Sequence, residues 1–367
     1  MIDGSAPPGA DPGPGAGAQD LRTAAQRRLD ALWARGRAFL GTERAIMGGA
    51  MTWVSERNLV AAISNAGGFG VIASGSMTPA LLEAEIRATR ALTDRPFGVN
   101  LITLHPRLDA LIDLCLDMRV GHIVLAGGLP RGQAITRIKA GGAKLMCFAP
   151  APVIARKLVR DGVDALIIEG MEAGGHIGPV STSVLAQEIL PLIREVPVFV
   201  AGGIGRGEAV LTYLEMGAAG CQLGTRFVCA TESIAHANFK RAFVRASARD
   251  AVPSVQLDPR LPVIPVRALA NKATEEFAAT QRRLVAEIDE GTVALKDAQL
   301  AVEHFWAGAL RRAVVDGDVD RGSVMAGQSV GMVVEEQPTR TILDQLTEQA
   351  IQAILARTAF DGPGRPA

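Results

Sequence analysis

The stretch VPVFVAGGIGRGEAVLTYLEMGAAGCQLGTRFV, residues 196–228, places one helical pattern between two apolar runs. The runs at 196–204 and 220–228 are continuously apolar, which is typical of strands buried on both faces of a parallel sheet. Between them, residues 208–218 carry apolar side chains at helical spacing and end at a helix-stopping glycine. The stretch therefore predicts a strand–helix–strand unit of a parallel sheet covered by helices.

The same unit recurs from about residue 45 onward. Six further apolar runs precede this stretch: AIMGGAM (45–51), FGVIAS (69–74), FGVNLI (97–102), HIVLAGG (122–128), KLMCFAP (144–150) and ALIIEG (165–170). Eight strand-then-helix units favour an α/β fold of the (β/α)8 TIM-barrel type over a doubly wound sheet with a nucleotide crevice. Nearly every run ends in glycine or polar residues, and in a barrel all those ends meet on one face.

The composition changes at both ends of this repeating region. Residues 1–24 are rich in Gly, Pro and Ala and predict a disordered tail. Residues 25–250 are predicted to form the barrel. After that, a proline-interrupted segment leads to helical patterns at 271–290, 297–315 and 339–358. We expect residues 251–367 to form a helical cap and closing helices packed on the barrel.

Composition and charge exclude several classes of partner. Hydrophobic residues make up 48% of the chain and aromatics only 4%, so the core must be aliphatic. The 38 basic and 38 acidic residues balance, and no long basic run favours nucleic acid or an anionic membrane surface. No apolar stretch approaches the roughly 20 residues of a membrane helix. The opening residues do not resemble a signal peptide. We therefore expect a cytoplasmic protein.

The cysteines and histidines show no metal-ligand spacing. Four cysteines without a C-x-x-C pair are expected to be buried thiols in a reducing compartment: Cys115, Cys147, Cys221 and Cys229. Four of the five histidines are expected to be structural: His105, His122, His236 and His304. No metal site is predicted.

Two glycine-rich loops follow the seventh and eighth predicted strands, where TIM barrels commonly bind phosphate. The first contains Gly202 and Gly203, and the second contains Gly224 and Thr225. Phosphate binding needs exposed backbone N–H groups without a Cβ in the way, and a threonine hydroxyl adds a donor. Alternatively, the glycines only make the turns. Because no Rossmann or P-loop pattern is present, the pair of loops favours a phosphate-bearing cofactor held by a barrel.

The fifth histidine, His176, lies in EGMEAGGHIG (169–178), directly after the sixth predicted strand. The surrounding glycines would let a flat ligand approach the backbone, and an imidazole there can accept or donate a proton near pH 7. Asn100 and Glu169 end the third and sixth strands and could orient a planar heterocycle. The alternatives are a helix cap for Asn100, an ion pair for Glu169 and a structural role for His176.

Six motifs, in order, closely resemble the nitronate monooxygenase (2-nitropropane dioxygenase) family, which includes FMN-dependent enoyl-acyl-carrier-protein reductases. The motifs are AISNAGGFGVI, RPFGVN, EGMEAGGHIG, AGGIGRGEA, QLGTRFV and GSVMAGQ, within about residues 40–335. The resemblance implies a TIM barrel that binds FMN non-covalently at its carboxyl-terminal face.

The same resemblance implies roles for individual residues. His176 would be the catalytic histidine. Asn100, Glu169 and Gly174 would line the isoalloxazine, and many relatives have Gln in place of Glu169. Gly202, Gly203, Gln222, Gly224 and Thr225 would hold the phosphate end. Gly49 and Met51 would contact the flavin through the backbone, although IMGGAM (46–51) departs from the QGGM or APM of relatives.

Two activities are compatible with the resemblance, both on a small-molecule substrate. The first expectation is nitronate monooxygenase activity, in which alkyl nitronates are oxidised by O2 with His176 as base. The alternative is an NAD(P)H-dependent FMN enoyl-thioester reductase of fatty-acid synthesis, for which Arg260 and Arg267 are candidates to receive an acidic carrier protein. Ile177 stands where many monooxygenases have Arg, and this difference favours the reductase. A non-catalytic FMN-binding protein is a third possibility, and a homodimer is left open.

Overall fold

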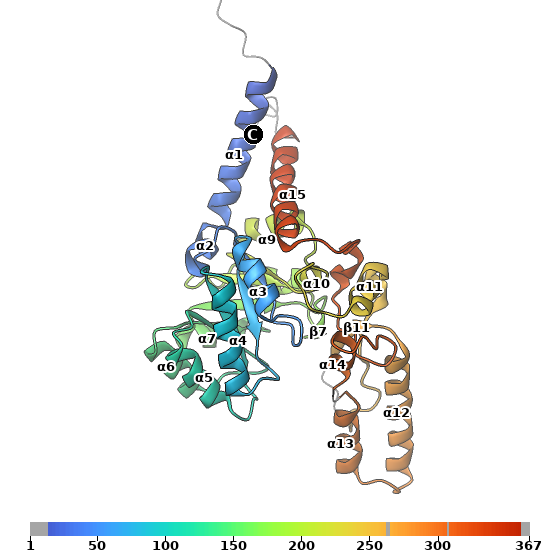
Figure 1. Ribbon diagram of the computed structural model, residues 1–367. Helices are drawn as coiled ribbons and strands as arrows, with labels where there is room; N and C mark the ends of the chain where they lie inside the picture. The colour runs from blue at the N-terminus through green and yellow to red at the C-terminus, as the bar shows by residue number, and fades with distance from the viewer. Residues whose placement is uncertain (1–13, 262–264, 307, 361–367) are drawn as a thin grey trace, which may run out of the picture.

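The computed structural model describes residues 14–360 apart from 262–264 and 307 (Figure 1). Its centre is an eight-stranded parallel sheet with the order β1-β9-β8-β6-β5-β4-β3-β2, and a Met47–Phe69 bridge joins the two ends of this order. The strands are β1 (Ile46–Gly48), β2 (Gly70–Ala73), β3 (Phe97–Ile102), β4 (His122–Ala126), β5 (Lys144–Phe148), β6 (Ala165–Glu169), β8 (Val198–Ala201) and β9 (Gly220–Leu223). Each lies inside one of the eight predicted runs, so the TIM-barrel prediction is confirmed.

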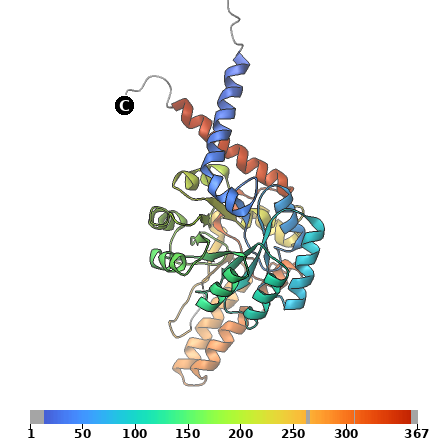
Figure 2. The same cartoon turned by 90° about the vertical axis from the view of Figure 1, so that its left-hand side faces the viewer.

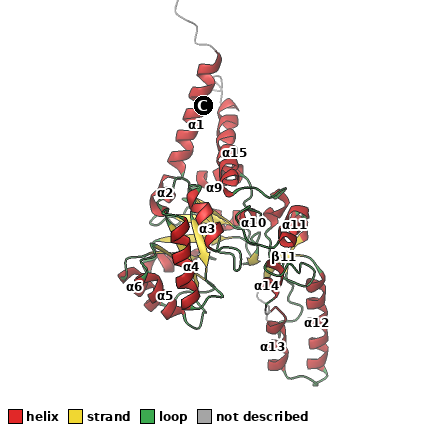
Figure 3. Cartoon of the chain, viewed as in Figure 1, coloured by secondary structure: helices red, strands yellow, loops and turns green. Residues whose placement is uncertain are grey.

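Helices surround the strands (Figure 3). They are α3 (Arg57–Asn65), α4 (Pro79–Leu92), α5 (Leu108–Asp117), α6 (Gly132–Ala140), α7 (Pro152–Arg160), α8 (Thr182–Ile189), α9 (Gly207–Glu215), α10 (Thr225–Val228) and α11 (Ala237–Arg245). Local sequence sets their starts: the Thr78 hydroxyl caps α4 by accepting from Leu81 N, and Pro79 takes the first helical position. Their apolar faces pack on the outside of the barrel.

A separate apolar cluster fills the barrel interior, with Met47, Phe69, Met146, Ile167 and Phe199 all fully buried. Burying each such side chain contributes about 1.5–3 kcal/mol to folding. At the amino end of the strands, α2 (Ala34–Leu40) closes the barrel.

Polar contacts at this floor are satisfied. The Phe39 carbonyl accepts from Lys144 Nζ and lies 2.9 Å from His122 Nε2. Burial lowers the pKa of His122 to about 4, which keeps its ring neutral. The four cysteines are buried as well.

A small antiparallel sheet lies beyond the carboxyl ends of the barrel strands. It consists of β10 (Ala251–Pro253), β11 (Val266–Leu269) and β7 (Gly175–His176), in the order β10-β11-β7. An Ala268–Met325 bridge attaches a later loop to β11. The sheet joins the loop after β6 to the carboxyl-terminal part of the chain, as seen beside α14 (Ala309–Val314) in Figure 1.

The carboxyl-terminal region has two parts. Helices α12 (Lys272–Asp289) and α13 (Leu295–Trp306) form a hairpin that projects from the barrel (Figure 1) and has its own small core around Phe277, Leu284 and Val302. The long helix α15 (Thr339–Phe360) instead lies against α9 and α1 (Pro14–Leu32). This second part packs on the barrel helices α9 and α3.

The predicted tail needs a correction, because α1 begins at Pro14 and residues 14–24 are helical. Ala25 and Leu29 bury one face of this helix, and Arg22 forms an ion pair with Glu348 of α15 at 2.5 Å. Figure 2 shows α15 (red) crossing α1 (blue) at one end of the barrel. Composition misled here because tertiary packing overrides a weak local preference for disorder. Residues 1–13 of the predicted tail lie outside the described residues.

Within the described part of the chain, no helix combines the length and apolarity needed to cross a membrane.

Two glycines at the first position of a helix give a matched test of the α9–α15 packing. A Cβ on Gly207 of α9 would lie 1.9 Å from the Leu346 carbonyl of α15, whereas nothing lies within 4 Å of a Cβ on Gly132 of α6. We expect Gly207→Ala to lower the free energy of unfolding by about 2 kcal/mol or more through overpacking. Gly132→Ala should leave it within about 0.5 kcal/mol. Urea unfolding measures both, and equal stabilities would contradict the packing described.

Candidate active site

The predicted site residues lie where the barrel strands end, and the loops after β1 and β9 adjoin. Gly49 N donates to the Leu223 carbonyl at 2.8 Å. A Cβ on Gly224 would lie 3.4 Å from Met51 Sδ. The structure therefore brings Gly49, Met51 and Gly224 together, next to Gln222 at the end of β9 and Thr225 at the start of α10.

The turn after β8 depends on its two glycines. Gly202 and Gly203 have φ of +96° and +71°, in the left-handed region that favours glycine. A Cβ on Gly202 would lie 2.9 Å from Thr182 Oγ1, and one on Gly203 would lie 2.9 Å from Glu172 Cβ. The turn alone thus requires both glycines. A role of theirs in phosphate binding stays a prediction.

Glu172 holds the loop that carries His176 through its carboxylate and its backbone carbonyl. Glu172 Oε2 accepts from both the backbone N and the hydroxyl of Thr182, each at 2.9 Å, at the start of α8. Its backbone carbonyl accepts from Gln328 N at 2.9 Å. Sequence reasoning gave Glu172 no role, although it stands in the same glycine-rich stretch as His176. It was missed because its partners lie 10 and 156 residues further along the chain.

The loop at residues 322–328 joins the His176 loop to α10. Gly327 N donates to Thr225 Oγ1 at 2.9 Å, and a Cβ on Gly174 would lie only 2.6 Å from Gly327 N. Gly174 is therefore needed for this close backbone approach, whatever else it lines. Gly327 was also missed, even though its motif GSVMAGQ had been noticed, because only the fold brings it to the strand ends.

His176 lies on β7, and it is exposed. Its ring has no hydrogen-bond partner within the described residues. The surrounding protein still removes part of its hydration, and this desolvation lowers the pKa of His176 below its ordinary value. The neutral imidazole therefore prevails near pH 7, and this is the form that accepts a proton.

Three polar side chains come from β3, β6 and β9: Glu169 ends β6, whereas Asn100 and Gln222 lie two residues and one residue before the ends of β3 and β9. Asn100 is 5% exposed, and its Nδ2 donates to the Val124 carbonyl at 3.3 Å, so it does not cap the following helix. Gln222 and Glu169 form no side-chain hydrogen bond or ion pair within the described residues, so the ion pair considered for Glu169 is not present there. Burial raises the pKa of Glu169 to about 8, so its carboxyl is mainly protonated at neutral pH.

This set of groups fits a flavin. An unpaired carboxyl and an unpaired amide at strand ends offer donors and acceptors that a planar heterocycle with ring N–H and carbonyl groups would satisfy. At the nearby glycines, no side chain stands between the backbone and a bound ligand. The chemistry of the donor set therefore suits the cofactor expected from the resemblance.

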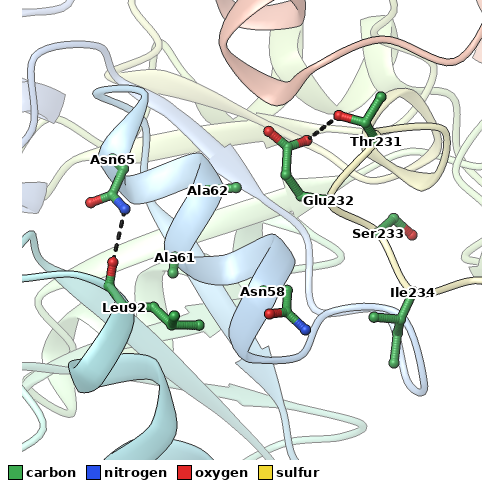
Figure 4. A pocket seen from close by; sticks show the side chains of 9 residues that line it. All are labelled: Asn58, Ala61, Ala62, Asn65, Leu92, Thr231, Glu232, Ser233 and Ile234. Carbon is green, nitrogen blue, oxygen red and sulfur yellow. Dashed lines mark hydrogen bonds between the residues drawn. The ribbon is translucent and has the colours of Figure 1, made fainter.

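A shallow hollow elsewhere on the surface is not part of this arrangement. It lies between α3 and residues 231–234, lined by Asn58, Asn65 and Ile234 among others (Figure 4). The carboxylate of Glu232 accepts from Thr231 Oγ1 at 3.1 Å and from the backbone N and hydroxyl of Thr339, where α15 begins. Its charged group is thus occupied in capping a helix, away from the strand ends.

The fold and the strand-end groups define a TIM-barrel enzyme with its site at the carboxyl end of the strands. The sequence model described as nitronate monooxygenase matches residues 34–111 and 107–349. The chain therefore belongs to the nitronate monooxygenase family of flavin-dependent oxidoreductases.

Three comparisons indicate the range of this family. A (3aS,4S,5R,7aS)-5-hydroxy-7a-methyl-1-oxo-octahydro-1H-indene-4-carboxyl-CoA dehydrogenase of Rhodococcus jostii is 30% identical over 348 residues, covering 88% of this chain and 96% of the relative. A nitronate monooxygenase of Paraburkholderia phytofirmans is 29% identical over 286 residues, covering 64% and 76%. The solved structure of FabK from Thermotoga maritima superposes with a TM-score of 0.80 at 35% identity, covering 89% of this chain and 98% of FabK.

The raised pKa of Glu169 predicts a pH dependence of stability in the flavin-free protein. Because the folded state binds this proton more tightly than the unfolded chain, the free energy of unfolding should fall as pH rises from about 4.5 to about 8. The contribution of one group has a slope of at most about 1.4 kcal/mol per pH unit. Glu169→Gln should remove this part of the decline. An unchanged slope in urea unfolding would contradict the burial of an unpaired carboxyl.

Proposed function

We propose that the protein is an FMN-dependent oxidoreductase of an acyl thioester. It would add or remove hydrogen at the α- and β-carbons of the acyl chain. The observation that carries the proposal is the near-complete alignment with a relative named for a carboxyl-CoA substrate, 88% of this chain against 64% for the Paraburkholderia nitronate monooxygenase. The similarity to FabK covers 89% of this chain and 98% of FabK.

The proposed chemistry uses the imidazole of His176 at the carbon next to the carbonyl. A C–H bond there is acidified by the carbonyl, so a neutral imidazole can take its proton in the oxidative direction and return it in the reductive direction. FMN, when bound, accepts or supplies the hydride at the neighbouring carbon. The lowered pKa of His176 supports its role as the proton acceptor near pH 7.

Other residues would hold the cofactor. Asn100, Glu169 and Gln222 would bind the polar edge of the isoalloxazine, with the backbone at Gly49, Met51 and Gly174 beside the ring. Gly202, Gly203, Gly224 and Thr225 would bind the phosphate. The hydroxyl of Thr225 already accepts from Gly327 N, which leaves its own proton free to donate.

Coenzyme A is the thioester carrier favoured over an acidic carrier protein. The expectation that Arg267 receives such a protein is wrong, because this side chain is 2% exposed and donates to two backbone carbonyls. Arg260 is engaged by Asp258 and Asp289 at 2.8 and 2.7 Å. In the reductive direction, NAD(P)H would serve as co-substrate.

Nitronate oxidation by O2, the first expectation from sequence, is the second candidate. The family match and the 29% identical nitronate monooxygenase favour it. The same base would act on a carbon acidified by a nitro group in place of a carbonyl. This activity requires FMN, O2 and the base but no nicotinamide.

Anaerobic mixing of the flavin-loaded protein separates the two candidates. A saturated acyl-CoA, or NADPH followed by an enoyl-CoA, should change the flavin absorbance rapidly if the thioester proposal holds. Bleaching by propionate 3-nitronate alone, with no response to thioesters or NADPH, would establish the second candidate instead. Failure of the purified protein to take up FMN would exclude both.

His176→Ala tests the proton transfer directly. We expect the variant to retain its flavin spectrum and lose about 10²–10⁴-fold in kcat on the thioester, the usual contribution of a positioned acid–base group. His304→Ala is the matched control, because His304 is an exposed histidine on α13, outside the barrel. Steady-state kinetics checks both variants, and full activity of His176→Ala would refute the assigned role.

A further inference from the structure

The segment that carries His176 is held mainly by backbone contacts. In β7, His176 pairs with Val266 of β11 and Gly175 pairs with Arg267. Just beyond β7, Ile177 N donates to the Pro265 carbonyl at 3.0 Å. Since the ring has no partner of its own among the described residues, its position follows from how this backbone is anchored.

One buried side chain fixes that backbone from a second direction. Arg267 Nε donates to the Met171 carbonyl at 2.9 Å, and its Nη1 donates to the Ala251 carbonyl at 2.5 Å. The guanidinium thereby joins β10 and β11 to the start of the His176 loop, where Met171 lies 96 residues before Arg267 in sequence. It holds the loop at Met171, while the β11 pairing holds it from Gly175 to Ile177.

Burying the guanidinium of Arg267 costs free energy of folding. The residue is 2% exposed and forms no ion pair within the described residues. Burial lowers the pKa of its guanidinium, with Glu172 acting in the opposite direction, but arginine remains protonated. An unpaired buried cation destabilises a fold, so an apolar residue would serve packing alone better.

We propose that Arg267 is the positioning residue for His176, its guanidinium fork fixing the loop so that the imidazole faces the substrate carbon. This inference rests on the proposed role of His176 as the acid–base group. Arginine suits the task because its planar fork spans two carbonyls with fixed geometry, which a lysine ammonium cannot do. Arg267 touches neither substrate nor cofactor in this account.

The test compares two variants with a control from the same segment. Arg267→Lys keeps the charge and loses the fork, and Arg267→Met loses both. Arg260→Met removes a partly exposed arginine that forms ion pairs with Asp258 and Asp289. In flavin-loaded protein, 13C NMR follows the imidazoles of the five histidines through a pH titration. His176→Ala assigns the His176 resonance.

A loosened loop hydrates the ring, so the pKa of His176 should rise toward the ordinary value of about 6.5 in both Arg267 variants and stay unchanged in Arg260→Met. In acyl-CoA turnover, kcat should fall by about 10- to 100-fold with KM changed less than about 3-fold, as expected for a misplaced catalytic group. The rising limb of the kcat/KM pH profile should move with the NMR titration.

Three results would overturn the proposal. An unchanged His176 titration in both Arg267 variants, with only the melting temperature lowered, would leave Arg267 a purely structural residue. A shift in Arg267→Met alone would assign the effect to charge and not to the fork. If the Met variant does not fold, an unchanged titration in Arg267→Lys is decisive against it. Should no thioester be turned over by the wild type, the proposed function fails, while the NMR titration still tests the link between Arg267 and the His176 loop.

Discussion

The rest of the structure depends on the closure of eight parallel strands into one barrel, completed where β1 pairs with β9 and bridges toward β2. Closure leaves no sheet edge and covers both faces of the strands, which explains why the strand sequences are mainly apolar and do not alternate. Because the strands are parallel, all their carboxyl ends lie on one side. Residues 49, 100, 169, 202 and 222 therefore meet at that side although they span most of the barrel sequence.

The two ends of the barrel differ in how their polar groups are satisfied. At the amino end, His122 and Lys144 both contact the carbonyl of Phe39. At the carboxyl end, Glu169, Gln222 and His176 lack side-chain partners within the described residues. Polar groups with little access to water, such as Gln222, destabilise a protein when unpaired, so their position at this end favours a bound ligand that satisfies them.

The antiparallel sheet β10-β11-β7 connects this chemistry to the carboxyl-terminal region. It places His176 on a two-residue strand that pairs with β11, and Arg267 and Glu172 hold the same loop through hydrogen bonds. The segment that follows β11 enters the projecting α12–α13 hairpin. The position of His176 thus depends on β11, which contributes nothing to the barrel wall.

The sequence by itself determined the eight strands, because a strand buried on both faces is mainly apolar. It also predicted a site formed by the strand-end residues and His176, because polar groups that follow such strands all lie on one side of a barrel. It also allowed the family to be recognised from local motifs. Only the tertiary structure decided what holds His176: the β7–β11 pairing, the Arg267 contacts, the Glu172–Thr182 bonds and the Gly174–Gly327 approach. It likewise converted residues 14–24 from an expected tail into a helix against α15. These contacts join residues 10 to more than 300 positions apart, and such pairings leave no periodic pattern in sequence since their register is set by the packing of the whole fold.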